Sequence, residues 1–267
     1  VTNLSIFLIL SIYRILVTED DVKKLQDDLN RLYQWSIDWQ MLFNVDKCKV
    51  IQFGFNNRKA SYSMGNNVLE SVTEERDLGV IIHQSLKSSS QCVKAVKSAN
   101  ATLGMIKRTF ITRNKTTLLQ LYKTLVRPKL EYCVQAWRPF LQRDIELLEK
   151  VQRRATRMMV ENKTLSYEER LKSLHLTTLE TRRLRGDLIE VFKILKNMEG
   201  TDSNLYFKLS STGLRGHSLK LYKQEARLDV RKYFFSHRVV DIWNALPEWV
   251  IGSNNVDNFK IKLDRYL

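Results

Sequence analysis

The spacing of hydrophobic residues changes along the chain, and each change marks a different kind of element. Apolar residues recur every three or four positions from Val22 to Leu32, which predicts an amphipathic helix. Between residues 41 and 86 short alternating runs replace that period and predict a small sheet. It comprises a strand in residues 41–55, a hairpin turning near Gly65-Asn66, and a short apolar strand interrupted by Gly79.

Helical spacing resumes after the sheet, in residues 92–110, 116–128 and 130–159, with Pro128 and Pro139 at turns or helix starts. An apolar stripe in the last of these segments predicts a face that docks on a core. The stripe consists of Ile145, Leu148, Val151, Ala155 and Met158. Four cations lie largely off it: Lys150, Arg153, Arg154 and Arg157. Such a helix can pack against its neighbours and still present positive charge to solvent.

Two further helices are predicted by capping boxes, which pair Ser166 with Glu169 and Thr177 with Glu180. The second helix carries an apolar stripe, and a terminal helical unit ends at Pro247. The stripe is Leu184, Leu188, Phe192 and Leu195, and the anchors of the terminal unit are Phe234, Phe235, Val239, Trp243 and Leu246. Only 9 Gly and 3 Pro occur among 267 residues, which favours long helices over a barrel or sandwich. The predicted fold class is α+β and mostly helical.

Asp20 and Asp21 allow two interpretations. Adjacent carboxylates can hold the divalent cations of a polymerase, but such a pair sits in a tight turn between two apolar strands. Here the downstream flank has a helical period, and Thr18 stands where an N-cap would, with Asp21 at the acidic position of a capping box. The helix-start interpretation is therefore favoured over metal ligation.

Cysteine and histidine positions indicate no metal site. Cys48, Cys92 and Cys133 are 44 and 41 residues apart, which matches neither a zinc knuckle nor a disulfide framework and predicts a reduced, intracellular chain, nuclear or cytoplasmic. The four histidines are scattered. The apolar run from Leu4 to Val17 has 14 residues and contains Arg14, so it is expected neither to cross a bilayer nor to act as a secretory signal.

Positive charge is concentrated in one part of the chain. Of a formal net charge of +15, residues 94–158 hold most, with 15 Lys and Arg against 4 Asp and Glu. This concentration favours contact with a phosphate backbone over a merely solvated face, and an anionic membrane is a weaker option because the helices lack a Trp- and Phe-rich insertion face. The "RRLR" run at residues 182–185 could touch RNA or form a salt-bridged surface.

A series of motifs in order resembles the back half of a reverse transcriptase from a non-LTR retrotransposon of the jockey or chicken-repeat type. The motifs are "FNVDKCKVIQFG", "RDLGVII", "LYKTLVRPKLEYCVQAWRP", "LEKVQRRATRM" and "FFSHRVVDIWNALP", and the resemblance covers nearly everything from Asp21 to Leu267. It implies a partial polymerase palm in residues 1–90, a basic helical thumb in residues 91–160 and a helical C-terminal domain in residues 161–267.

The resemblance also implies roles for individual residues. Lys47 would be the lysine of motif D, near the leaving pyrophosphate, and Leu78 with Gly79 would form the primer-grip turn. The thumb would hold template and primer through cations, namely Lys94, Lys97, Lys107, Arg108, Lys150, Arg153, Arg154 and Arg157. The family's aromatic-x-Asp-Asp turn should fall within residues 4–16, where nothing acidic stands.

The sequence therefore predicts a fragment of an RNA-directed DNA polymerase that keeps template- and primer-binding parts but does not polymerise alone. The implied partners are an RNA template and a DNA primer, with no membrane. Mg²⁺ is implied for the intact parent enzyme and is not expected to be retained here. The alternative is a non-enzymatic nucleic-acid-binding or adaptor protein domesticated from a retroelement, or an inert relic.

Overall fold

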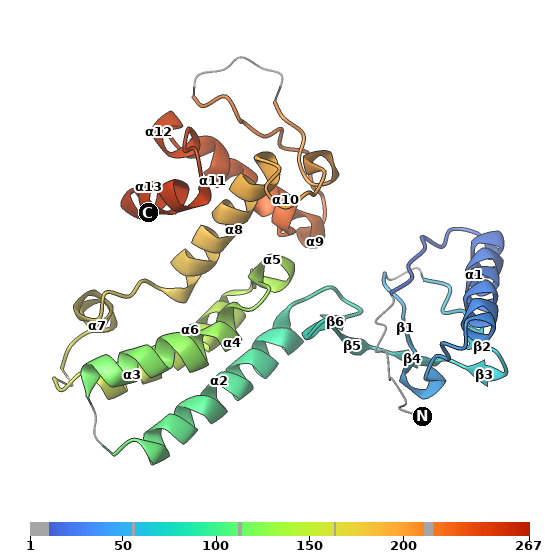
Figure 1. Ribbon diagram of the computed structural model, residues 1–267, viewed down its shortest axis with the longest axis horizontal. Coiled ribbons are helices and arrows are strands. Elements are labelled where there is room, and N and C mark those ends of the chain that lie inside the picture. The colour runs from blue at the N-terminus through green and yellow to red at the C-terminus, as the bar shows by residue number, and fades with distance from the viewer. Residues whose placement is uncertain (1–10, 55–56, 112–113, 163, 211–215) are drawn as a thin grey trace. The chain divides into compact units, whose positions relative to one another are not determined.

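The computed structural model describes residues 11–54, 57–111, 114–162, 164–210 and 216–267 (Figure 1). The chain divides into two compact units, Val1–Leu86 and Lys87–Leu267, each of which is described by itself. Helices dominate the second unit, whereas every paired strand belongs to the first within the described residues, apart from one isolated bridge between Leu209 and Leu221. The mostly helical α+β class is thus confirmed.

The described part of the first unit has one long helix and three pairs of short strands. The helix is α1 (Glu19–Asp38), and the 3₁₀ turn η1 (Val45–Lys47) follows it. The strands are β1 (Lys49–Ile51), β2 (Ser63–Met64), β3 (Asn67–Val68), β4 (Glu70–Val72), β5 (Glu74–Asp77) and β6 (Val80–His83). β1 pairs with β4 in parallel, whereas β2–β3 and β5–β6 are antiparallel.

A small core joins α1 to the β2–β3 hairpin. Leu29 packs with Tyr62, Met64 and Leu69, and the apolar face of α1 lies around them. Gln26 fixes the register of this contact, since its side-chain amide donates to the Ser63 carbonyl at 2.9 Å and accepts from the Ser63 N–H at 3.0 Å. The predicted turn at Gly65-Asn66 is confirmed.

Two predicted strands differ from the structure. The prediction covered residues 41–55. In residues 41–54, the described part of that segment, only β1 pairs, because the residues before it form a turn: Lys47 N–H donates to the Asn44 carbonyl and Cys48 N–H to the Val45 carbonyl. The predicted strand interrupted by Gly79 is a hairpin. Leu78 and Gly79 both have left-handed φ, +43° and +89°, and form the two-residue turn between β5 and β6.

The first half of the second unit is a helical bundle. Its elements are α2 (Ser89–Thr109), α3 (Lys115–Leu121), the π-helical turn η2 (Tyr122–Val126), α4 (Arg127–Glu131), α5 (Val134–Trp137) and α6 (Gln142–Met159). The segment predicted to be helical over residues 130–159 is therefore interrupted twice. Cys133 takes a left-handed φ of +53° between α4 and α5, and Trp137 holds the turn by donating its indole N–H to the Tyr132 carbonyl at 2.6 Å.

The second half of the unit continues with α7 (Tyr167–Ser173), α8 (Leu179–Leu195), η3 (Ser203–Leu205), α9 (Asp229–Lys232), α10 (Phe235–Arg238), α11 (Val240–Ala245), α12 (Glu248–Ile251) and α13 (Val256–Tyr266). The Ser166–Glu169 capping box is confirmed. The Thr177–Glu180 box is wrong, because Thr178 caps α8 by accepting a hydrogen bond from the Thr181 N–H. Of the predicted terminal anchors, Trp243 is buried in the core, whereas Phe234 is 46% exposed.

Helix α8 contacts both halves of the second unit. Its C-terminal half packs Leu188, Val191 and Phe192 into the core made by α10 to α13. Between its halves the fully buried Asp187 binds two arginines, Arg138 after α5 and Arg238 of α10. One carboxylate therefore ties three segments together.

Candidate nucleic-acid interface

Helices α2 and α6 pack side by side and run in the same direction. Near their starts the Ser89 hydroxyl donates to Asp144 Oδ2 at 2.6 Å, and further along Arg154 Nη1 donates to Asn100 Oδ1 at 2.8 Å. The two helices therefore lie next to each other along much of their length (Figure 1), and each keeps a row of exposed residues.

The inner face of α6 is more polar than its sequence indicates. Met159 is buried while Met158 is only partly buried, so the predicted stripe ends one residue later than expected. Gln152 is also fully buried on this inner face, and its Oε1 accepts a hydrogen bond from the Tyr122 hydroxyl at 2.6 Å. The Gln152 amide donates to the Thr177 carbonyl at 3.0 Å. Glu149 accepts from Tyr167 and from the first N–H of α8. These bonds fix the rotation of α6 and hence which cations face outward.

The four predicted cations of α6 all lie on its exposed side. They spread toward two neighbours: Arg154 reaches α2 through Asn100, and the Arg153 guanidinium lies 4.3 Å from the centroid of the Tyr167 ring on α7. Sequence reasoning missed Asn100 and Tyr167, because both act through contacts between segments far apart in the chain. Lys150 and Arg157 complete the exposed row.

Helix α2 contributes the other predicted cations. Lys97, Lys107 and Arg108 are exposed and Lys94 is partly buried. In the described part of the chain, no carboxylate forms an ion pair with Lys97, Lys107, Arg108, Lys150, Arg153 or Arg154. We call these six residues the α2–α6 cation face.

Other cations of the same unit have carboxylate partners. Arg182 binds Glu131 with two hydrogen bonds and Arg185 binds Asp264 likewise. Of the two interpretations of "RRLR", the salt-bridged surface describes these two arginines, while Arg183 is buried. A cation already neutralised by a carboxylate gains less from a phosphate, so the α2–α6 cation face is the better candidate for a polyanion.

The remaining predicted site residues belong to the first unit. Lys47 is exposed at the end of η1, and Cys48 separates it from β1. Leu78 is 67% exposed at the tip of the β5–β6 hairpin, next to the half-buried Gly79. Both hairpin residues are thus accessible to a ligand, and Lys47 stands on a different segment of that unit.

Asp20 and Asp21 lie in the first turn of α1, as the helix-start interpretation predicts. The Asp21 carboxylate accepts bonds from the Thr18 N–H, the Thr18 hydroxyl and the Val17 N–H, and these bonds lower its pKa to about 2. Asp20 pairs with Lys24. Both carboxylates therefore lie in the first turn of a helix and not in a tight turn between two strands, and within the described residues no cluster of three His, Cys, Asp or Glu side chains could hold a metal.

None of the helices in the described part of the chain has the length and apolar character of a membrane span; residues 4–10 of the apolar run at residues 4–17 lie outside that part.

Comparison with known proteins gives one partial likeness. Residues of this chain are 26% identical, over 117 positions, to the RNA-directed DNA polymerase from mobile element jockey of Drosophila funebris. The match covers 42% of this chain and 13% of that protein. No family model and no solved structure matches. Over part of its length, this chain is thus related to a reverse transcriptase of a mobile element.

Proposed function

We propose that this chain is the part of a non-LTR retrotransposon reverse transcriptase that holds template and primer, and that it binds an RNA/DNA hybrid without catalysing nucleotide addition. The observation that carries the proposal is the α2–α6 cation face, in which six cations without carboxylate partners among the described residues lie on two adjacent parallel helices. The partial likeness to the jockey polymerase supports the choice of an RNA/DNA hybrid as the polyanion.

The chemistry of the α2–α6 cation face suits a sugar-phosphate backbone. Each cation that neutralises a phosphate releases condensed counterions, which makes binding strong at low salt and weak at high salt. Arg153 and Arg154 are held in place by Tyr167 and Asn100, so they lose little conformational freedom when a phosphate binds. In this proposal α2 and α6 form the thumb, and residues 1–90 supply a partial palm in which Leu78 and Gly79 touch the primer and Lys47 lies near the triphosphate.

The proposed absence of catalysis is supported by the position of the acidic pair at the start of α1. Asp21 caps the helix and Asp20 pairs with Lys24, so neither carboxylate is disposed to hold Mg²⁺. We expect purified protein, supplied with primer, template, Mg²⁺ and nucleotides, to show no incorporation above background. Incorporation that disappears in the variant D20N/D21N would overturn this part of the proposal.

The binding claim is tested with a fluorescent RNA/DNA hybrid titrated at several salt concentrations. We expect log K to fall linearly with log[salt]. The variant K150A/R153A/R154A removes three members of the α2–α6 cation face and should reduce the magnitude of the slope by about 0.9 for each phosphate that the protein no longer neutralises, hence by up to about 3.

A matched control removes three cations of the second unit that have carboxylate partners. Lys193, Lys223 and Lys260 pair with Glu199, Asp241 and Asp257. The variant K193A/K223A/K260A has the same net charge as the test variant and should keep most of the slope. Equal reductions in both variants would mean that net charge, rather than the α2–α6 cation face, governs binding. A flat salt dependence in the wild-type protein would contradict the proposal itself.

The second candidate function is a non-enzymatic nucleic-acid-binding or adaptor protein domesticated from a retroelement. The same binding assay distinguishes the two functions by specificity. A thumb should bind the hybrid duplex more tightly than single-stranded RNA of equal length, whereas an adaptor that does not recognise duplex geometry should bind both with similar affinity.

A further inference from the structure

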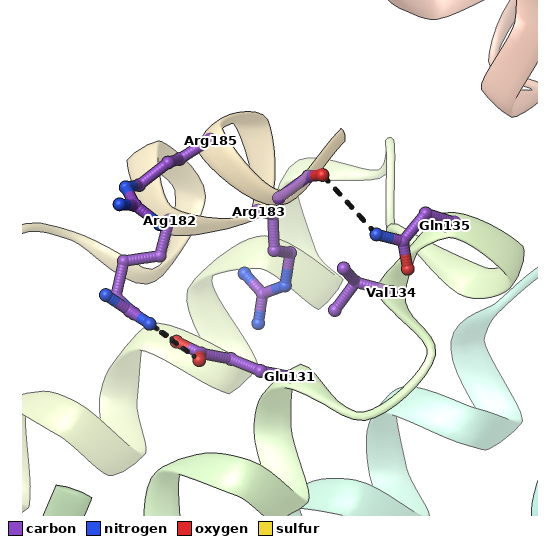
Figure 2. Close-up of a pocket in the computed structure, with 7 residues that line it drawn as sticks. Glu131, Val134, Gln135, Arg182, Arg183 and Arg185 are labelled. Atoms are coloured by element: carbon purple, nitrogen blue, oxygen red, sulfur yellow. Dashed lines mark hydrogen bonds and ion pairs between the residues drawn. The ribbon is translucent and has the colours of Figure 1, made fainter. Parts of the chain in front are cut away.

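A pocket of about 160 Å³ lies where α4, α5 and α8 meet (Figure 2). Glu131 lines it from α4, Gln135 from α5, and Arg182, Arg183 and Arg185 from α8. Since each water molecule takes about 30 Å³ in the liquid, the pocket has room for a small polyatomic ion together with water.

Arg183 is the unusual member of this group. Its side chain is 2% exposed, yet no carboxylate of the described residues lies within ion-pair distance of it. Within the same part of the chain its Nε has no hydrogen-bond partner, and Nη2 makes a long bond of 3.5 Å to the Leu130 carbonyl. Figure 2 shows the guanidinium extending from α8 into the space between Glu131 and Val134.

A guanidinium in this state is energetically costly. Arginine keeps its proton in proteins, and a buried charge normally has a counter-charge and filled hydrogen bonds. Burial lowers the pKa of Arg183, as expected for a cation held away from water.

The carboxylate that lines the pocket, Glu131, does not form an ion pair with Arg183. Glu131 gives both oxygens to Arg182, with Nη2 to Oε2 at 3.0 Å, and lies 3.7 Å from Arg127 Nε. Asp264 is likewise engaged by Arg185. The buried Glu149 also acts on Arg183 electrostatically, but its oxygens accept from the Tyr167 hydroxyl and the Leu179 N–H, so among the described residues the Arg183 guanidinium has no ion-pair partner.

From these contacts we propose that the pocket binds a phosphate-type oxyanion, either a phosphate ion or a phosphate monoester, which pairs with Arg183. The guanidinium offers planar donors that match phosphate oxygens. The Gln135 amide, whose bond to the Gly186 carbonyl is a long 3.5 Å, is placed to donate as well. This site is separate from the α2–α6 cation face and does not depend on the proposed function.

Inorganic phosphate added to the full chain is the first test, with sodium chloride at equal ionic strength as the reference. Binding to the folded state raises the ratio of folded to unfolded protein by the factor 1 + [L]/Kd, about elevenfold at ten times the dissociation constant. We expect a saturable rise in Tm with phosphate and none with chloride. The same Tm in both salts would overturn the proposal.

Variants assign the effect to Arg183. R183M keeps the bulk and removes the charge, so the phosphate-dependent rise in Tm should disappear. R183K keeps a positive charge but lacks the planar guanidinium, so the midpoint of the Tm response should move to a higher phosphate concentration. If R183M does not fold, R183K is the variant that is compared with the wild-type protein. An unchanged midpoint in either variant would overturn the assignment. R154M, the same substitution on the α2–α6 cation face, should leave the phosphate response intact whether or not it weakens hybrid binding.

Two dinucleotides distinguish the source of the phosphate. A 5′-phosphorylated dinucleotide that raises Tm more than its unphosphorylated counterpart, in a manner abolished in R183M, identifies a monoester end as the ligand. Equal effects of the two dinucleotides, with a response to inorganic phosphate, identify the free ion. No response to any of the three would refute the pocket as an anion site.

Discussion

Replacement of Asp187 by Asn should destabilise the second unit more than any surface change of the same kind. Asp187 is fully buried and accepts three charge-assisted hydrogen bonds. Arg138 Nη1 donates to Oδ2 at 2.9 Å, Arg238 Nε donates to the same oxygen at 2.9 Å, and Arg238 Nη2 donates to Oδ1 at 2.8 Å. The Asn side chain has nearly the same shape but no charge, so both guanidiniums would remain largely buried without a counter-charge.

The expected cost follows from what remains for the two arginines. Removing one partner of a buried ion pair typically costs about 3–5 kcal/mol, because the other charge stays buried. Arg238 keeps bonds to the Tyr233 and Gln135 carbonyls at 3.2 and 3.1 Å, and its neighbour Arg138 has a side chain 17% exposed that can turn toward water. Both features reduce the cost, so we expect the free energy of unfolding of D187N to fall by about 3 kcal/mol.

Urea unfolding followed by circular dichroism measures this change, with an unaltered m-value as the sign that the folded and unfolded states keep their compactness. The matched control is D264N, which makes the same chemical change at a carboxylate whose side chain is 51% exposed and bound to Arg185. An exposed pair contributes about 0–1 kcal/mol. A fall in the stability of D187N no larger than that of D264N would refute the view that Asp187 holds the two halves of the unit together.

Three further predictions concern single residues. The pKa of Asp21 is depressed to about 2 from an ordinary 3.8, so its capping bond stabilises α1 fully above pH 4 and less as the pH falls toward 2; NMR shifts of the α1 amides should show this acid transition, and D21N should lack it. Leu78 has a left-handed φ, so L78N should relieve about 1 kcal/mol of strain and slow hydrogen exchange in β5–β6 about fivefold; faster exchange would contradict the strain argument. Alkylation should modify the exposed Cys133 first and Cys92 last, because burial, together with Asp144, raises the pKa of the Cys92 thiol to about 12; mass spectrometry of partly alkylated protein gives the order.

Features determined within a few residues were predictable from the sequence. The capping box at α1 depends on Thr18 and Asp21 alone, and the turn at Gly65-Asn66 depends on residues with intrinsic turn preference. Gly65 also has a packing reason, since a Cβ there would lie 2.6 Å from the Tyr33 ring. That second reason involves a residue on α1 and could not be predicted locally.

Features determined by distant contacts were not predictable. The arginines of "RRLR" look alike in the sequence, yet Arg182 binds Glu131, 51 residues away, and Arg185 binds Asp264, 79 residues away, while Arg183 faces a pocket. The break at Cys133 was also missed, because no Gly or Asn marks the left-handed position and the bond from the Trp137 indole to the Tyr132 carbonyl leaves no signal in the sequence. Charge concentration could be counted from the sequence, but which cations lack carboxylate partners among the described residues required the packed structure.

The common direction of α2 and α6 also shapes the electric field that a polyanion would meet. Peptide dipoles place roughly half a negative charge at the C-terminal end of a helix, and here two such ends lie together, close to Lys107, Arg108 and Arg157. Part of the charge of those three side chains is therefore offset by the backbone itself. The net attraction should be greatest nearer the middle of the pair, around Lys97 and Arg154, and a bound strand should be centred there, away from the ends of the helices.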